Sequence, residues 1–128
     1  MVVLMMHTIS RRSLLLAFTA IATGAARASA HSRKQSAQVV DITVERFSFT
    51  PSEFRVKAGV PVEIRLRSDD TDHGFRILGT DINIRIPKRG KGAATVTFVP
   101  PSAGRYVFEC SRLCGAGHSF MRGTLIAE

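Results

Sequence analysis

The chain has 128 residues, of which 45% are hydrophobic and 22% are charged, and this balance excludes a disordered chain and leaves room for one packed core. Lys and Arg number 18 against 10 Asp and Glu, which gives a formal net charge of +8. The sequence has no lysine- or arginine-rich helical pattern and no basic patch interleaved with aromatic residues, so we expect no nucleic-acid partner.

The first thirty residues differ in character from the rest and predict an export signal. Arg11 and Arg12 precede an apolar run from Leu14 to about Ala26, and small residues suited to a signal peptidase follow. This run of about 13 residues is shorter than the roughly 20 that cross a membrane, so we expect no stable transmembrane span. The paired arginines resemble a twin-arginine signal. We therefore predict a signal peptide at residues 1–30 and a periplasmic protein, with a tether by an uncleaved signal as the alternative.

Alternation of apolar and polar residues dominates the chain from residue 31 onward. Segments with this period of two begin at Val40, Val62, Ile82 and Ala94, and the period is typical of half-buried β-strands. Turn signals rich in Gly, Pro and Asp separate these segments at roughly the eight-to-twelve-residue spacing of a β-sandwich or small barrel. No helical period and no internal repeat is evident. The pattern therefore predicts one all-β domain.

Aromatic side chains recur along these predicted strands, and we expect them to fill the core. The set is Phe47, Phe49, Phe54, Phe75, Phe98, Tyr106 and Phe108. A sandwich of this size can bury a modest hydrophobic core. Trp is absent from the chain, which removes one common electron-relay side chain.

Two cysteines, a histidine and a methionine gather in one short stretch. Cys110, Cys114, His118 and Met121 follow one another at spacings of four, four and three residues. A helix would place them along one face, but two glycines inside the stretch argue against a helix. One predicted strand ends at Cys110 and another begins at Met121. We therefore expect a loop between two strands that can wrap around a single centre.

The donor types in this loop favour copper. Thiolate, thioether and imidazole ligands select copper or zinc over magnesium or calcium. Structural zinc sites have little use for methionine, whereas a long, weak methionine ligand is typical of copper electron-transfer sites. Structural zinc stays open as an alternative, and so does a disulfide between Cys110 and Cys114, since export leads to an oxidising compartment. Such a disulfide would close only a small loop and stabilise the fold little.

His73 is the other histidine well inside the predicted domain. It lies 37 residues before Cys110, just after a turn and at the start of a strand-like segment. A histidine in such a position is more often a satisfied polar residue than a ligand. Because a copper site in a sandwich needs a histidine from outside the cysteine loop, we take His73 as a candidate ligand.

The stretch from Cys110 to Met121, CSRLCGAGHSFM, closely resembles the binuclear copper (CuA) loop of cytochrome c oxidase subunit II, and a similar loop occurs in nitrous-oxide reductase. The upstream segment DHGFRILGTDINIRIPKRG is similar to the histidine segment of that family, and PPSAGRYVFEC is similar to its strand into the loop. The likeness spans most of residues 31–128.

The resemblance implies a cupredoxin-like Greek-key β-sandwich at residues 31–128 and a site for two copper ions. Six residues would supply two bridging thiolates, two imidazoles, one thioether and one backbone carbonyl. They are Cys110, Cys114, His73, His118, Met121 and, through its main-chain oxygen, Arg112.

The two ions would differ in their remaining ligands. The resemblance implies that one ion takes His73 and Met121, and that the other takes His118 and the carbonyl of Arg112. In the family that carbonyl belongs to a glutamate, so a positive side chain here replaces a negative one beside the site. We further expect Asp72 or a nearby backbone group to orient the His73 ring by a hydrogen bond.

The resemblance also implies one-electron transfer in a respiratory chain rather than bond-making catalysis. Oxidase subunit II usually carries two membrane helices, a Trp-containing path and acidic docking residues. Here Trp is absent, and 15 Lys and Arg face 10 Asp and Glu from His31 onward. We therefore expect an exported electron carrier, not an enzyme, with an acidic redox partner and Lys88–Lys91 as a candidate docking segment. A periplasmic copper carrier and a subunit of a terminal oxidase complex are the alternatives.

Overall fold

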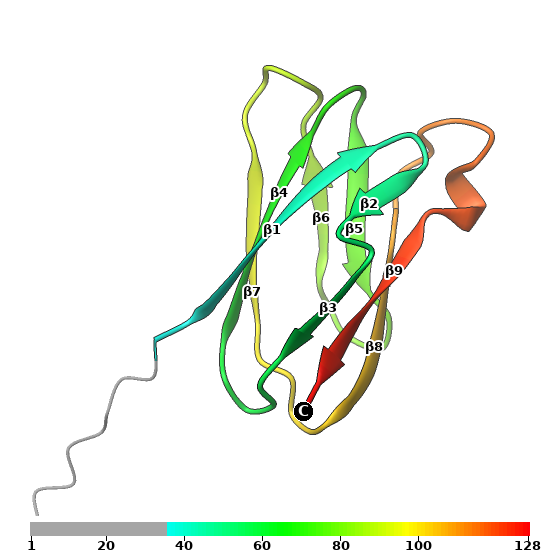
Figure 1. Ribbon diagram of the computed structural model, residues 1–128. Coiled ribbons are helices and arrows are strands. Elements are labelled where there is room, and N and C mark those ends of the chain that lie inside the picture. The colour runs from blue at the N-terminus through cyan, green and yellow to red at the C-terminus, as the bar shows by residue number, and fades with distance from the viewer. Residues whose placement is uncertain (1–35) are drawn as a thin grey trace, which may run out of the picture. The chain divides into compact units, whose positions relative to one another are not determined.

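The computed structural model describes residues 36–128, which form two β-sheets packed face to face (Figure 1). The predicted signal peptide at 1–30 lies outside the described residues. Within the described part, the one helical segment is a short 3-10 turn, η1 (His118–Phe120). No helix in this part is long and apolar enough to cross a membrane.

The first sheet has four strands in the order β2-β1-β4-β7. Their bounds are β1 (Gln38–Glu45), β2 (Ser48–Thr50), β4 (Val62–Ser68) and β7 (Ala94–Phe98). β1 runs parallel to β4, while the other two pairings are antiparallel. The register places Val44 of β1 opposite Ser68 of β4, so the two strands finish at the same end of the sandwich.

The second sheet has five strands in the order β3-β9-β8-β5-β6. Their bounds are β3 (Glu53–Val56), β5 (His73–Ile77), β6 (Asn83–Ile86), β8 (Gly104–Glu109) and β9 (Arg122–Ala127). β3 runs parallel to β9, and the remaining pairs are antiparallel. Because the chain passes repeatedly from one sheet to the other, neither sheet forms from consecutive strands alone. The predicted all-β sandwich is confirmed.

The core lies between the sheets and follows the period-two pattern. In β4, Val62, Ile64 and Leu66 are fully buried while the residues between them face outward or are half-buried. Phe108 lies at the centre of the core, with ring centroids 5.2 Å from both Phe49 and Phe75. Each buried aromatic or large aliphatic side chain contributes about 1.5–3 kcal/mol relative to an exposed one, so this cluster holds the sheets together.

Phe47 departs from the predicted core. It lies in the turn between β1 and β2 and is 38% exposed, whereas Phe49, two residues on, is buried. Phe54 and Tyr106 are only partly buried and pack against the edge of the core. The prediction was wrong for Phe47 because this residue belongs to a turn, where the alternation of a strand does not apply.

Several connections meet at one end of the sandwich (Figure 1). The β1–β2 turn, the β4–β5 connection and the loop between β8 and β9 all lie at this end, away from the carboxyl terminus. His73 opens β5 at this end, and the loop at residues 110–121 leaves β8 and returns as β9. The fold therefore brings the predicted histidine segment and the predicted cysteine loop together.

Candidate metal centre

The cysteine loop is a compact turn held by its own backbone. The Cys110 N–H donates to the Met121 carbonyl at 3.0 Å, which closes the base of the loop where β8 and β9 continue their pairing. Within the loop, His118 and Phe120 donate to the carbonyls of Gly115 and Gly117, each at 3.1 Å. Apart from the single 3-10 turn, the loop has no helix, as its two glycines predicted.

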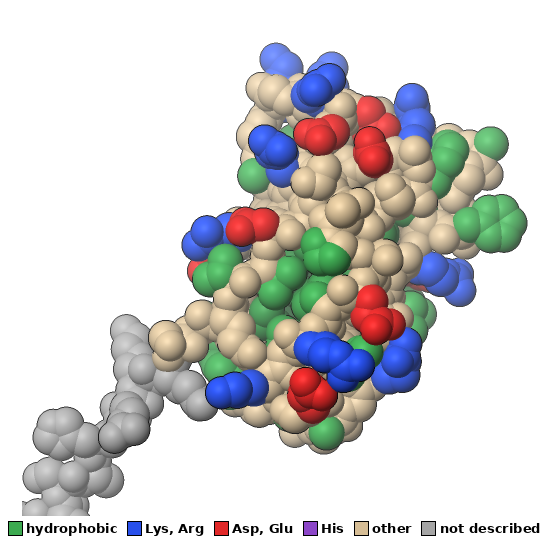
Figure 2. Space-filling view, in the orientation of Figure 1, with side chains coloured by type: hydrophobic (Ala, Val, Ile, Leu, Met, Phe, Trp, Pro, Cys, Tyr) green, Lys and Arg blue, Asp and Glu red, His purple; other side chains and the backbone are tan. Residues whose placement is uncertain are grey.

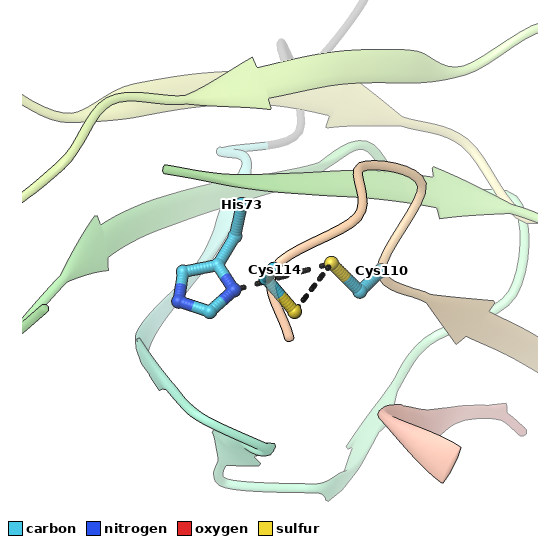
Figure 3. A group of neighbouring side chains, drawn as sticks. All are labelled: His73, Cys110 and Cys114. Carbon is cyan, nitrogen blue, oxygen red and sulfur yellow. Dashed lines mark hydrogen bonds between the residues drawn. The ribbon is translucent and has the colours of Figure 1, made fainter. Parts of the chain in front are cut away.

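Two buried thiols and one buried imidazole form the centre of the site (Figure 3). Cys110 and Cys114 are both free, and their Sγ atoms lie 3.8 Å apart. The His73 Nδ1 atom lies 3.9 Å from the Cys110 Sγ atom. The donor atoms of these three residues all lie within 4.8 Å of one another, so they can hold a metal ion together.

The other three predicted ligands lie around these thiols. The Cys110 thiol donates to the Arg112 carbonyl oxygen at 3.1 Å. The Cys114 Sγ atom lies 3.8 Å from the His118 Nδ1 atom and 3.8 Å from the Met121 Sδ atom. The fold thus brings all six side-chain and main-chain donors named from the sequence into one cluster.

These donors suit a soft metal ion. Two sulfur atoms 3.8 Å apart can both lie at about 2.3 Å, an ordinary metal–thiolate distance, from the same ion. Thiolate, thioether and imidazole donors are the set that selects copper or zinc. The sulfurs of Cys110 and Cys114 are buried with Met121, which keeps water away from the sulfur donors. The residues present therefore fit a copper site.

Asp70, not Asp72, orients the His73 ring. The Asp70 Oδ1 atom lies 2.7 Å from His73 Nε2, and this contact places the imidazole proton on Nε2. Nδ1, the nitrogen that faces the thiol of Cys110, is then left with a lone pair. The expectation for Asp72 was wrong because its carboxylate accepts from Arg85 and from the Lys88 N–H instead.

Asp70 is itself held by several donors. Its Oδ2 accepts the Arg46 N–H at 2.8 Å, and its Oδ1 accepts the Thr71 N–H at 2.6 Å. Burial would raise the pKa of this carboxyl, but the hydrogen bonds from His73, Arg46 and Thr71 outweigh it and lower the pKa to about 2. Asp70 is therefore a fixed anion behind the histidine.

The turn between β1 and β2 supports the cysteine loop from outside. Arg46 Nε donates to the Cys114 carbonyl at 2.7 Å. The Phe47 ring lies so close to Gly115 and Gly117 that a Cβ atom at Gly117 would come within 2.4 Å of it. Sequence reasoning missed both residues, because nothing local to Arg46 or Phe47 reports a contact with a loop some 68 residues away.

Burial changes the acidity of one thiol. Removal from water raises the pKa of Cys114 to about 11, and the hydrogen bond with Cys110 acts in the same direction. Opposing this, the Arg46 guanidinium lowers the pKa. The metal-free site therefore holds Cys114 as a thiol, and any metal bound here must displace its proton.

A glycine makes the close approach of the two segments possible. A Cβ atom on Gly74 would lie 2.1 Å from the Ser111 Oγ atom and 2.8 Å from the Arg112 nitrogen. Because Gly74 follows His73 directly, the absence of a side chain lets the cysteine loop lie against the start of β5. Ser111 in turn donates to the Asn83 Oδ1 atom at 2.7 Å, which ties the loop to β6.

A family model described as a cupredoxin-like domain matches residues 13–127. The chain belongs to this family. Cytochrome c oxidase subunit 2 of Thermus thermophilus is 32% identical to this cupredoxin-like chain over 82 residues, which cover 64% of the chain and 59% of that protein. The chain therefore spans less than two thirds of the length of this curated relative.

Solved structures share the fold of this cupredoxin-like chain. The periplasmic domain of subunit II of cytochrome oxidase from Bradyrhizobium japonicum has a TM-score of 0.63 at 17% identity, with 71% of the chain and 83% of that domain covered. Auracyanin A, a "blue" copper protein from Chloroflexus aurantiacus, has a TM-score of 0.57 at 21% identity, with 73% of the chain and 100% of that protein covered. The predicted cupredoxin-like fold is confirmed.

Proposed function

We propose that this protein is an exported electron carrier that holds two copper ions in the loop between β8 and β9. The observation that carries the proposal is the pair of buried thiols 3.8 Å apart, ringed by two imidazoles, a thioether and a backbone carbonyl. Copper and zinc sites in proteins commonly take about four ligands, and six donors are present here. A single metal ion would therefore leave donors unused.

Each residue has a definite role in this proposal. Cys110 and Cys114 would hold both ions through their thiolates. His73 and Met121 would complete the ligands of one ion, and His118 and the Arg112 carbonyl those of the other. His118 and Met121 can serve different ions although each lies 3.8 Å from the Cys114 Sγ atom, because that thiolate would serve both ions.

Copper bound in this way supplies reversible one-electron redox chemistry, since two thiolates neutralise two Cu(I) ions and loss of one electron leaves a single positive charge for both to share. The chain's part is to hold the donors in place and to exclude water. Asp70 fixes the His73 ring, and the Arg46–Phe47 turn fixes the loop. With all donor positions filled by protein, the site offers no open position for a substrate, which supports an electron carrier over an enzyme.

The relatives support the same proposal, with a role in a terminal oxidase complex as the alternative. Likeness to oxidase subunit 2 of Thermus thermophilus supports a role beside or within a terminal oxidase complex, and likeness to a "blue" copper protein supports a free carrier. The Arg-Arg signal at residues 1–30 supports export to the periplasm. We favour the free carrier, because the chain has a basic balance and no Trp.

Copper stoichiometry combined with electron paramagnetic resonance tests this function. The full chain, isolated after export and loaded with copper, should bind two ions and show one unpaired electron shared by two copper nuclei. A spectrum from a single copper nucleus, or tight zinc without redox activity, would contradict the proposal. Cys114→Ser should abolish the shared signal. Ready transfer of Cu(I) to an apo-oxidase, without a stable redox couple, would instead identify a copper carrier.

A further inference from the structure

Two apolar side chains point away from the site on the cysteine loop. Leu113 is 84% exposed and Phe120 is 82% exposed, the largest values among the large hydrophobic residues of the described chain. Each directly precedes a buried residue of the cluster, Cys114 and Met121 respectively. The inner side of the loop therefore carries the metal donors, while its outer side carries a leucine and a phenylalanine in water.

Phe47 is a third exposed apolar side chain beside the same loop. Its ring contacts Gly115 and Gly117 of the same loop and is 38% exposed. Single exposed hydrophobic residues are normal on protein surfaces. Here, however, three of them belong to one loop and the turn that supports it, and Figure 2 shows hydrophobic side chains gathered at the end of the molecule that carries this loop. We call Phe47, Leu113 and Phe120 the apolar face.

Positive charge surrounds the apolar face. Between Cys110 and Ala127 the sequence has no Asp or Glu, whereas Arg112 and Arg122 are exposed there. Arg46 directs its guanidinium to the Cys114 carbonyl. Among the ion pairs of the described residues, none includes Arg46 or Arg112. Arg112 acts on a carboxylate only at longer range, where its charge contributes to the lowered pKa of Asp72.

The acidic residue that adjoins the loop is covered by arginines. Glu109 is only 14% exposed and accepts from Arg76 Nε at 2.8 Å, while Arg122 approaches its other oxygen at 3.4 Å. The side chains of Arg76 and Arg122 are 48% and 58% exposed. A partner approaching this side meets two guanidinium groups rather than one carboxylate. We call Arg46, Arg76, Arg112 and Arg122 the basic rim.

We propose that the apolar face and the basic rim form the docking surface for an acidic redox protein. An apolar centre within a charged rim is the usual anatomy of a protein interface. The rim attracts a partner of opposite charge over several ångströms of solvent and repels a basic one. Docking here places the partner directly over the loop that holds Cys110 and Cys114, which shortens the path for an electron.

This inference rests on the proposed electron-transfer function and specifies its partner. The candidate docking segment Lys88–Lys91 lies near the β4–β5 connection, since the Arg89 N–H donates to the Asp70 carbonyl at 3.1 Å. That segment adds positive charge but has no exposed large hydrophobic residue. The basic rim, by contrast, encloses an apolar face. The surface around the cysteine loop is therefore the better candidate for the centre of the interface.

Mitochondrial cytochrome c, a basic protein, and the same cytochrome with its lysines succinylated provide a matched pair of probes. They share fold and haem but have opposite charge. The copper-loaded full chain should exchange electrons faster with the succinylated form at low ionic strength, and added salt should remove the difference. Equal rates with both forms, or a preference for native cytochrome c, would overturn the proposal.

Variants locate the surface. Arg112→Glu and Arg122→Glu should each slow the reaction with succinylated cytochrome c by about tenfold or more at low salt. Lys57→Glu makes the same charge change near the far end of β9, where Ala58 donates to the Glu128 carbonyl, and should have little effect. Leu113→Ser and Phe120→Ser should slow the reaction at high and low salt alike. Equal effects of the Lys57 and Arg112 changes would assign the preference to net charge alone and overturn the proposal.

A binding measurement separates this inference from the copper site itself. Amide chemical shifts of the protein, followed as succinylated cytochrome c is added, should change at the loop residues 110–122 and in the β1–β2 turn. This readout does not depend on electron transfer. If the protein failed to bind copper while these shifts still changed, the proposed function would be contradicted and the docking surface would be supported. Shifts confined to other faces would sink the docking surface whatever the copper site does.

Discussion

At the scale of single residues, Asp70 is the side chain on which the histidine depends. Its carboxylate holds His73 Nε2 at 2.7 Å, so the variant Asp70→Ala should free the ring and weaken copper binding by about 10–100-fold. Asp72→Ala is the matched control, because Asp72 bonds to Arg85 and the Lys88 N–H rather than to the ring. Competition with a Cu(I) chelator measures both affinities. Equal losses in the two variants would show that the ring does not depend on Asp70.

Arg46 places a positive charge next to the cluster without belonging to it. Oxidation by one electron would make the proposed copper pair more positive. A nearby cation disfavours this oxidised state and therefore raises the reduction potential. Arg46→Gln should therefore lower the potential by some tens of millivolts, since one charge at this range contributes on the order of 1 kcal/mol in a partly solvated site. Protein-film voltammetry measures the shift. Arg55→Gln, whose ion pair with Glu128 lies far from the loop, should leave the potential unchanged.

At the scale of elements, the β1–β2 turn and the cysteine loop fit together through a glycine. Gly117 has φ −90°, which any residue adopts, but a Cβ atom there would lie 2.4 Å from the Phe47 ring. Gly117→Ala should therefore destabilise the metal-free protein through overpacking, by about 1–3 kcal/mol. The free energy of unfolding in urea measures the change.

A second substitution shows whether the contact is the cause. Phe47→Ala removes the ring that the new methyl group would meet, so Gly117→Ala should cost little when made in the Phe47→Ala background. If Gly117→Ala lowered the free energy of unfolding as much in the Phe47→Ala background as in the native chain, the destabilisation would arise from a contact other than the Phe47 ring. Gly115 is not suited to this test, because its φ of +144° would strain any other residue regardless of the ring.

The same elements show what could and could not be predicted from the sequence. The alternation from Val62 to Leu66 predicts a strand because one face of each strand packs on the core. The ligand spacing from Cys110 to Met121 is equally local. Contacts of the β1–β2 turn are different, since Arg46 and Cys114 are 68 residues apart. Only the packing of two sheets brings them together, and that packing also decides between Asp70 and Asp72 for the histidine.

At the scale of the whole molecule, the site lies where strands of the second sheet that are separated along the sequence come together. His73 opens β5, Cys110 follows β8, and Met121 precedes β9. Copper bound by these residues would connect three neighbouring strands at one end of the sandwich, while the described strands of the first sheet contribute none of the six donors. The core between the sheets includes Cys110, Cys114 and Met121 together with the aromatic cluster around Phe108, so the ligand side chains are packed in the core before any metal binds.

This arrangement predicts how copper alters stability. A ligand that binds only the folded state stabilises it by RT ln(1 + [L]/Kd), about 4 kcal/mol when free copper exceeds Kd a thousandfold. For a domain of this size each kcal/mol raises Tm by roughly 4–8 °C, so copper removal should lower Tm by about 15 °C or more and still leave a cooperative transition. Calorimetry on the loaded and chelator-treated protein measures both. Cys114→Ser should lose most of this copper-dependent rise while keeping a cooperative metal-free transition, at a Tm lowered by the hydroxyl now buried at this core position. Loss of any cooperative transition without copper would mean that the metal, rather than the aromatic core, holds the sandwich together.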